Sequence, residues 1–165
     1  MPSPTVLSDA LQGIPLELRW SDQDAYGHVN NVSFFRLLEE ARFRFFTYPL
    51  AELAQEGASA DDTMWTLMSP DTKALVARNE IEYRRQLEWQ AQPVHALLRV
   101  PAMGGSSFDV SYTLMDAEHE ITYVVARTTL VQVNMETGRP VRLGPKMRTM
   151  LPTLDGEITP FRPRS

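Results

Sequence analysis

Residues 20–46 read WSDQDAYGHVNNVSFFRLLEEARFRFF and join a turn-forming segment to a long apolar one. The first half is rich in Ser, Asp, Gly and Asn, which are typical of turns. In the second half apolar residues recur at helical steps of three and four, at Phe34, Leu37, Leu38, Ala41 and Phe45. Asn30 or Asn31 can cap this helix, because an Asn side-chain oxygen accepts a free amide of the first turn. The sequence therefore predicts a helix over residues 32–46.

The apolar face of this helix is wider than one stripe, because Phe35, Phe43 and Phe46 lie outside the main repeat. A helix that is apolar on most sides is usually buried and covered by other elements. Residues 14–20, IPLELRW, alternate apolar and charged side chains, which is the period of a strand. Four further strand-like runs follow, at residues 74–83, 93–103, 106–116 and 120–134.

Short polar or glycine-containing links separate these runs, which favours antiparallel neighbours. The order of elements predicts an α+β domain in which a curved antiparallel sheet of about five strands wraps one long central helix. We expect this single domain at residues 14–151, after a leader at 1–13. A Pro- and Arg-containing tail at 152–165 follows, which Pro152, Pro160 and Pro163 predict to be poorly ordered. Open sheet edges also favour a homodimer or a higher oligomer.

The composition excludes several classes of protein. The 165 residues are 43% apolar, include no cysteine and carry a formal charge of −5. Such a chain can build a core, and it has neither a disulfide framework nor a thiolate site. The acidic balance argues against a nucleic-acid partner, and no apolar run reaches the length of a membrane span. The N-terminus lacks the pattern of a signal peptide, so we expect a cytoplasmic protein.

The charge is uneven along the chain. Residues 139–165 hold six basic and two acidic side chains, a balance of +4, whereas the ten basic and 19 acidic side chains of residues 1–138 give −9. This basic end is either a solvated terminus or a positive rim that attracts an anionic ligand.

Polar side chains gather within residues 22–31, just before the helix: Asp22, Asp24, Tyr26, Gly27, His28, Asn30 and Asn31. A helix N-terminus offers unpaired amides that can hold a developing oxyanion. A carboxylate beside it can attack a carbonyl or activate a water, and His28 can position any of these groups. The same residues also suit an ordinary capped turn, so composition alone leaves both interpretations open. We expect Asp22 to serve the turn.

Other candidate residues are less specific. Glu39 and Glu40 are either partners of neighbouring arginines or a secondary acid that faces a cleft. Ser106 and Ser107 most simply begin a strand. The three histidines are far apart in sequence without metal-ligand spacing, and no glycine-rich nucleotide motif occurs.

The stretch RWSDQDAYGHVNNVSFFRLLEEAR resembles the D-x-D-x-x-G-H-V-N-N signature of hotdog-fold acyl-CoA thioesterases, the 4-hydroxybenzoyl-CoA thioesterase-like family. Similar pieces occur in ALVARNEIEYRR, GGSSFDVSYTL and VQVNMETGRPVRL, so the resemblance covers residues 14–150. It implies hydrolysis of the thioester bond of an acyl-CoA or an acyl carrier protein. It further implies dimers or tetramers with sites at the subunit interface, and no metal or dissociable cofactor.

Within this resemblance the second Asp of the signature falls on Asp24, which acts as general base or nucleophile. His28 matches an active-site His of the similar plant acyl carrier protein thioesterases. Tyr26 replaces an Asn of those enzymes, so their catalytic arrangement does not transfer. The resemblance places the oxyanion donors and substrate contacts at Gly27, Val29, Asn30 and Asn31, with Tyr26 beside them.

The coenzyme A contacts follow less directly, because residues 86–93 depart from the family pattern. The chain is poor in lysine, so arginines and nearby hydroxyls are the candidates, at Arg84, Arg85, Arg139, Arg142, Ser106 and Ser107. Two other functions fit a hotdog domain. One is acyl-CoA binding without cleavage, against which the intact Asp24 and His28 argue. The other is hydration or dehydration of an acyl thioester, whose usual Asp–His spacing is longer than the four residues here.

Overall fold

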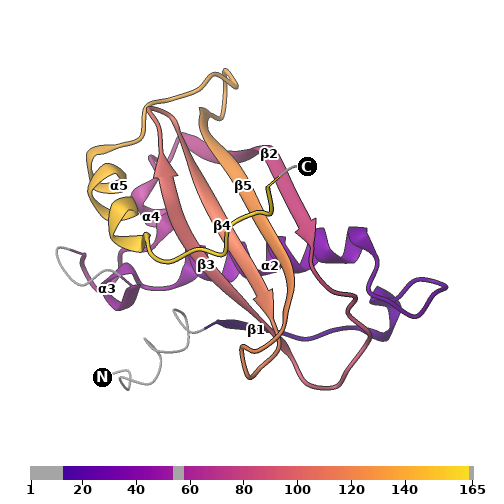
Figure 1. Cartoon of the computed structure of the whole chain (residues 1–165). Helices are drawn as coiled ribbons and strands as arrows, with labels where there is room; N and C mark the ends of the chain where they lie inside the picture. Colours follow the sequence, from indigo (N-terminus) through magenta and orange to yellow (C-terminus); the bar gives the residue numbers. More distant parts are fainter. Residues whose placement is uncertain (1–12, 54–57, 164–165) are drawn as a thin grey trace.

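The computed structural model describes residues 13–53 and 58–163, so the predicted leader lies outside the described residues except for Gly13. One long helix, α2 (Asn31–Thr47), lies against a five-stranded sheet (Figure 1). The strands are β1 (Ile14–Leu16), β2 (Thr72–Tyr83), β3 (Val94–Met103), β4 (Ser107–Met115) and β5 (Thr122–Asn134). Short helices are η1 (Trp20–Asp22), α3 (Leu50–Leu53), α4 (Met64–Leu67), α5 (Pro145–Met150) and η2 (Leu151–Leu154). The predicted α+β arrangement is confirmed.

The ends of the elements follow local chemistry. Helix α2 starts one residue before and ends one residue after the predicted range, and Asn30 is its cap. The first strand is shorter than the predicted 14–20. The chain turns at Arg19, because the Arg19 amide donates to the buried Asp22 carboxylate at 2.7 Å.

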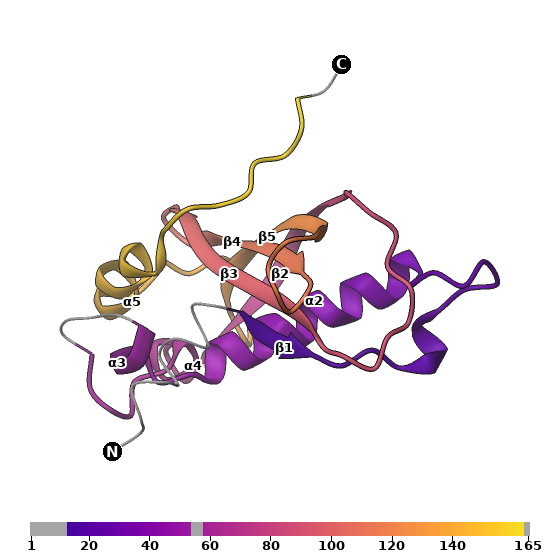
Figure 2. The same ribbon diagram turned by 60° about the horizontal axis from the view of Figure 1, so that its bottom comes forward.

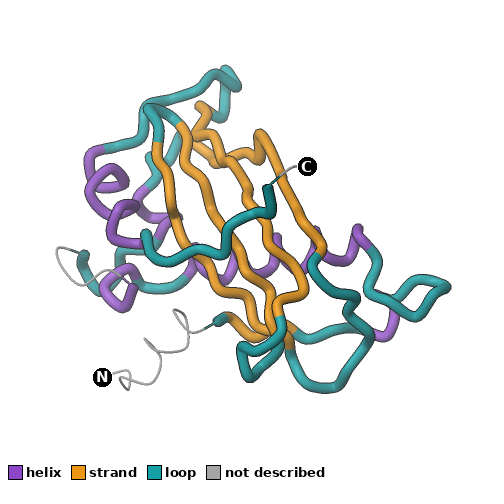
Figure 3. Tube along the Cα trace, viewed as in Figure 1, coloured by secondary structure: helices purple, strands orange, loops and turns teal. Residues whose placement is uncertain are grey.

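The sheet has the strand order β1-β3-β4-β5-β2, and every neighbouring pair is antiparallel. Strands β3, β4 and β5 lie beside one another, as their short links predict. The prediction of adjacent strands is wrong for β2 and β3, because β2 pairs with β5 at the far edge. The segment between them, residues 84–93, instead crosses the end of the sheet and bonds to residues 18–29 (Figure 3).

Helix α2 packs on one face of the sheet (Figure 2). Its buried apolar side chains are Phe34, Leu37, Leu38, Ala41, Phe45 and Phe46. They share one core with inward-facing strand residues such as Leu98, Val110 and Leu114. Removing this apolar surface from water is the main force that holds the helix in place.

One side of α2 stays open, contrary to the expectation of a helix covered on most sides. Phe35 is 37% exposed and Phe43 is 59% exposed. The reason is the topology, because β2 is the last strand of the sheet and nothing in the described chain extends beyond it. Leu75 and Val76 of β2 are exposed at the same edge.

The C-terminal tail crosses the face of the sheet opposite α2 (Figures 1 and 2). Thr113 of β4 donates a hydrogen bond to Thr159 at 3.0 Å, and the Phe161 ring lies 5.8 Å from the Arg127 guanidinium carbon. Val125 points to this face by strand alternation, yet it is only 2% exposed. These contacts differ from the poorly ordered end that the prolines predicted.

Candidate active site

The signature segment begins at a buried carboxylate. Asp22 is 4% exposed and accepts hydrogen bonds from the Arg19 amide and the Arg36 guanidinium, both at 2.7 Å. The Asn30 amide donates to the Asp22 carbonyl oxygen at 3.0 Å. A buried carboxylate needs such partners, because an unpaired buried charge is costly. Asp22 therefore ties the loop to α2, which is the structural role predicted for it.

Asp24 lies in the exposed part of the same loop. Its Oδ1 accepts the amides of Tyr26 at 2.8 Å and His28 at 3.3 Å. Its own amide donates to the His28 carbonyl oxygen at 2.8 Å. The turn needs Gly27, whose φ of +79° lies in the left-handed region. Oδ2 of Asp24 accepts no hydrogen bond from the described residues, so one carboxylate oxygen is anchored and the other is available to a ligand.

Two of the amides expected to hold a carbonyl oxygen are engaged within the chain. The Gly27 amide donates to the Asp24 carbonyl oxygen at 3.1 Å, and the Val29 amide donates to the Leu87 carbonyl oxygen at 2.7 Å. Together with the His28 amide, which bonds Asp24, these donors build the loop.

Free amides lie at the start of α2. Asn30 caps the helix by accepting the Ser33 amide at 3.0 Å. The amides of Asn31 and Val32 are the first two of the helix and find no acceptor within residues 13–53 and 58–163. The positive end of the helix dipole lies here as well. This helix start is therefore suited to hold a developing oxyanion.

A pocket of about 690 Å³ opens beside these groups. It brings together predicted site residues from two distant segments: Asp24, Tyr26, His28, Val29, Asn30, Asn31, Arg84 and Arg85. Its lining also includes Phe34, one of the helix aromatics that suit either an apolar acyl group or the core, and three residues that the sequence did not indicate: Tyr83, Gln86 and Leu87. Gly27 shapes the loop but is not part of this lining.

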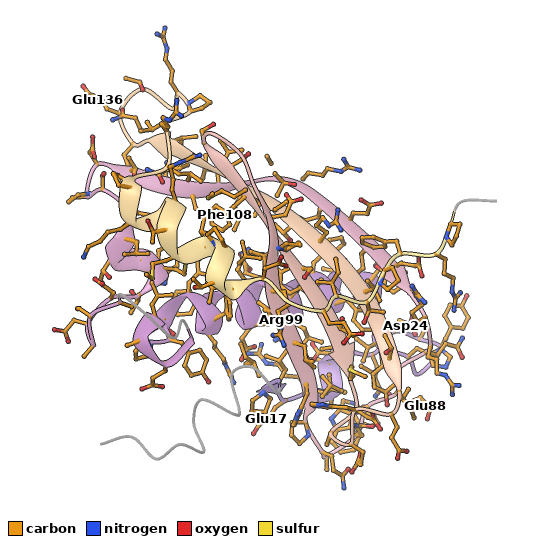
Figure 4. All side chains as sticks on the ribbon, turned by 60° about the vertical axis from the view of Figure 1, so that its left-hand side comes forward. Glu17, Asp24, Glu88, Arg99, Phe108 and Glu136 are labelled. Atoms are coloured by element: carbon orange, nitrogen blue, oxygen red, sulfur yellow. The ribbon has the colours of Figure 1, made fainter. Side chains whose placement is uncertain are left out.

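The segment that follows β2, residues 84–87, forms the second wall of the pocket. It is attached to the signature loop, because Leu87 accepts the Val29 amide and Glu88 forms a β-bridge with His28. Figure 4 shows Asp24 and Glu88 at the same end of the sheet. The Trp89 indole donates to the Leu18 carbonyl oxygen at 3.3 Å. In the sequence, the apolar Leu87 and Trp89 alternate with polar residues of this link. This alternation was the signal that could have revealed the wall.

An aromatic pair lines the inner side of the pocket. The rings of Phe34 on α2 and Tyr83 on β2 lie 5.5 Å apart at 59°. Burial raises the pKa of Tyr83 above its usual range, so its hydroxyl stays protonated at neutral pH. This part of the pocket therefore offers an apolar surface that carries the neutral Tyr83 hydroxyl.

The predicted secondary acids lie outside this pocket. Glu40 pairs with Arg36 at 3.4 Å and with Arg44, which are neighbours on the same helix. The Glu39 side chain is 74% exposed and lies 3.9 Å from Arg42. These are ordinary helix-surface ion pairs.

Ser106 and Ser107 lie at the turn between β3 and β4. This turn is at the end of the sheet opposite the pocket, since Ser107 pairs with Val131 whereas Tyr83 pairs with Val124. Within one chain these two serines therefore do not reach the pocket.

The two arginines of the wall differ in availability. Arg84 forms an ion pair with Glu82 and donates to the Pro160 carbonyl oxygen at 2.6 Å. Arg85 is exposed, and its guanidinium makes no hydrogen bond or ion pair with any part of the chain described. Arg85 is therefore better placed than Arg84 to meet an anionic ligand.

Within the described part of the chain, no three His, Cys, Asp or Glu side chains are grouped so as to hold a metal ion. None of the described helices combines the length and the apolar character needed to cross a bilayer.

A model of the Thioesterase-like superfamily matches residues 18–151 of the chain, which include both walls of the pocket. The chain belongs to this superfamily. Its sheet and central helix are the hotdog fold, in agreement with the resemblance of the signature.

Similar proteins are found among sequences and solved structures. The YsmA protein of Bacillus subtilis strain 168 is 27% identical over 128 residues, which are 76% of this chain and 75% of that protein. A thioesterase from Thermus thermophilus, solved with coenzyme A and Zn, is 26% identical with a TM-score of 0.63, covering 88% of this chain and 95% of that chain. The PA5185 protein of Pseudomonas aeruginosa shares the fold at 24% identity, with a TM-score of 0.69 over 91% of this chain and 97% of that chain.

The left-handed backbone conformation of Gly27 in the signature loop can be tested by measuring the stability of the protein. We expect Gly27→Ala to lower the free energy of unfolding by about 1 kcal/mol, because a Cβ strains this backbone conformation. Apart from its two chain neighbours, no described residue has an atom within 4 Å of the added Cβ, so steric contact adds little to this loss. Gly105→Ala is the matched control, since its Cβ also meets open space and its φ is not in the left-handed region. Urea unfolding measures both variants, and equal losses would contradict the turn.

Proposed function

We propose that the protein hydrolyses the thioester bond of an acyl-CoA, or of an acyl carrier protein, to a free acid and a thiol. One observation carries the proposal: the available oxygen of Asp24 and the free amide of Asn31 at the start of α2 serve one pocket with an aromatic wall. Acyl transfer from a thioester needs a base or nucleophile beside an oxyanion donor. Membership of the thioesterase-like superfamily supports the same general reaction.

In this proposal the thioester carbonyl oxygen lies at the amides of Asn31 and Val32. Asp24 either takes a proton from the water that attacks the carbonyl carbon, or attacks that carbon itself to form an anhydride that water then opens. In both routes the C–S bond breaks, the thiolate leaves and takes up a proton, and the acid is released. His28 positions the water or the carbonyl. We further propose that the reaction uses water and no dissociable cofactor, and that it takes place in the cytoplasm.

A homodimer formed through β2 completes the proposal. Strand β2 is a twelve-residue edge strand, and Leu75 and Val76 on it are each 45% exposed. Exposed Phe35 and Phe43 of α2 lie next to this edge and share hollows with Val76. A second copy that adds its own β2 antiparallel, about a two-fold axis, would pair the open backbone groups and cover these side chains.

Such a dimer would bring opposite ends of two chains together. The Tyr83 end of one β2 would lie beside the Thr72 end of the other. The turn with Arg139 and Arg142 follows Asn134, which pairs with Thr72. Figure 4 shows Glu136 of this turn far from Asp24 within one chain. In the dimer the turn of the second copy would lie about 10 Å, two strand spacings, from the pocket.

These basic residues of the second copy would hold the phosphates of coenzyme A, with Arg85 of the first. The thioesterase of Thermus thermophilus, complexed with coenzyme A, supports coenzyme A as a ligand of this fold. The site would then be incomplete in a single chain, and Arg139 and Arg142 would form the positive rim.

The catalytic role of Asp24 is tested by measuring thiol release from a panel of acyl-CoAs. We expect Asp24→Asn to lower kcat by about 100-fold or more, because the variant keeps the shape of the side chain and loses the base or nucleophile. Glu17→Gln, an exposed carboxylate of the first segment, is the control and should match wild type. If wild type turns over a substrate and Asp24→Asn does so equally fast, the assignment is wrong. Saturable binding without thiol release would indicate a binding module, and hydration of crotonyl-CoA would indicate a hydratase.

The shared site is tested by mixing two inactive variants. Asp24→Asn and the double variant Arg139→Met/Arg142→Met, unfolded together and refolded as a mixture, should regain about a quarter of wild-type activity at subsaturating acyl-CoA. The mixed dimer keeps one site with both the acid and the partner's arginines. Each variant refolded alone is the control. No gain over the two controls would contradict a site built from two chains.

A further inference from the structure

The end of β2 makes contacts with the C-terminal tail that the proposed chemistry does not use. The Arg84 guanidinium donates to the Pro160 carbonyl oxygen at 2.6 Å. The Arg162 amide donates to Oε2 of Glu82 at 2.8 Å, and its guanidinium lies 3.7 Å from Oε1. Glu82 also pairs with Arg84. The side chains of Glu82 and Arg84 are 23% and 18% exposed, whereas that of Arg162 is 63% exposed.

Strand alternation directs these contacts to the face of the sheet opposite α2, and of their residues only Arg84 also lines the pocket. Tyr83 points toward α2, where its ring meets Phe34 and lines the pocket. Glu82 and Arg84, on either side of it, point toward the opposite face of the sheet, where the tail passes (Figure 2). The tail therefore contacts the end of β2 on the face of the sheet opposite α2. These contacts flank Tyr83, which lines the pocket.

The same point is where the chain leaves the sheet. The amides of Arg84 and Arg85 both donate to the Tyr123 carbonyl oxygen, at 2.8 and 3.3 Å. The next residues, Gln86 and Leu87, line the pocket without belonging to a strand or helix. The wall is thus fixed at its far end by the Leu87 bond to the signature loop and at its near end by Tyr123 and the tail.

We propose that residues 158–162 form a strap that sets the position of the pocket wall, with Glu82 and Arg84 as positioning residues. The inference rests on the proposed function, because it assigns the wall to substrate binding. Asp24 is held by its own loop and by the Asp22–Arg36 pair. Loss of the strap therefore moves one wall and leaves the acid in place, so it weakens substrate binding more than the chemical step.

The test compares a chain that ends at Asp155 with full-length Arg84→Met and Arg84→Lys. We expect amide hydrogen exchange of residues 84–89 to be about 10-fold faster in the truncated chain and in Arg84→Met. For an acyl-CoA that wild type hydrolyses, KM should rise about 3- to 10-fold with kcat within about 2-fold. Arg84→Lys keeps a charged donor and should recover part of both effects. Arg148→Met removes an arginine whose guanidinium bonds Gly104 and is the matched control.

Two results would overturn the strap. One is unchanged exchange of residues 84–89 in the truncated chain and in Arg84→Met. The other is a lower melting temperature with unchanged exchange and KM, which would give the tail a purely stabilising role. If the truncated chain does not fold, the Arg84 variants decide the question in the full chain. If wild type hydrolyses no thioester, the proposed function fails, while hydrogen exchange still tests the strap.

Discussion

The burial of one face of α2 against the sheet is the constraint on which the rest of the structure depends. Leu37 and Ala41, at the centre of that face, are fully buried. A helix held this firmly by apolar contacts must still satisfy the first amides of its backbone. The side chain and the carbonyl oxygen of Asn30 accept the amides of Ser33 and Phe34. The amides of Asn31 and Val32 find no acceptor in the described chain, and Asn31 lines the pocket. The packing of the core thus places two backbone amides without acceptors, those of Asn31 and Val32, at the start of the helix.

Two sets of contacts then place the chemical groups around those donors. Asp22 and Arg36 tie the signature loop to α2, and Asp24 is held by amides of its own turn. The opposite wall comes from the chain after β2 and joins the loop through Leu87 and Val29. Asp24 and the wall at residues 84–87 are held mainly by different contacts. Substitutions can therefore change substrate binding and the chemical step separately.

Local patterns predicted the part of the site that lies within one segment. Asp24, His28 and Asn30 stand within seven residues of one another, so turn and cap chemistry indicate them directly. Tyr83 and Leu87 were not identified, because they reach the pocket only when β2 crosses to the far edge of the sheet, a non-local pairing that link length does not reveal. The prolines of the tail predicted local disorder. Its contacts with Arg84 and Glu82 arise from the open face of the sheet, which no local pattern shows.

In the proposed reaction, a thioester carbonyl binds at the start of α2 beside Asp24. A crystal structure of Asp24→Asn with a bound acyl-CoA tests this most directly. We expect the carbonyl oxygen at about 3 Å from the amide nitrogens of Asn31 and Val32, with the acyl group against Phe34 and Tyr83. A thioester bound elsewhere, or with its carbonyl turned away from the helix start, would contradict it.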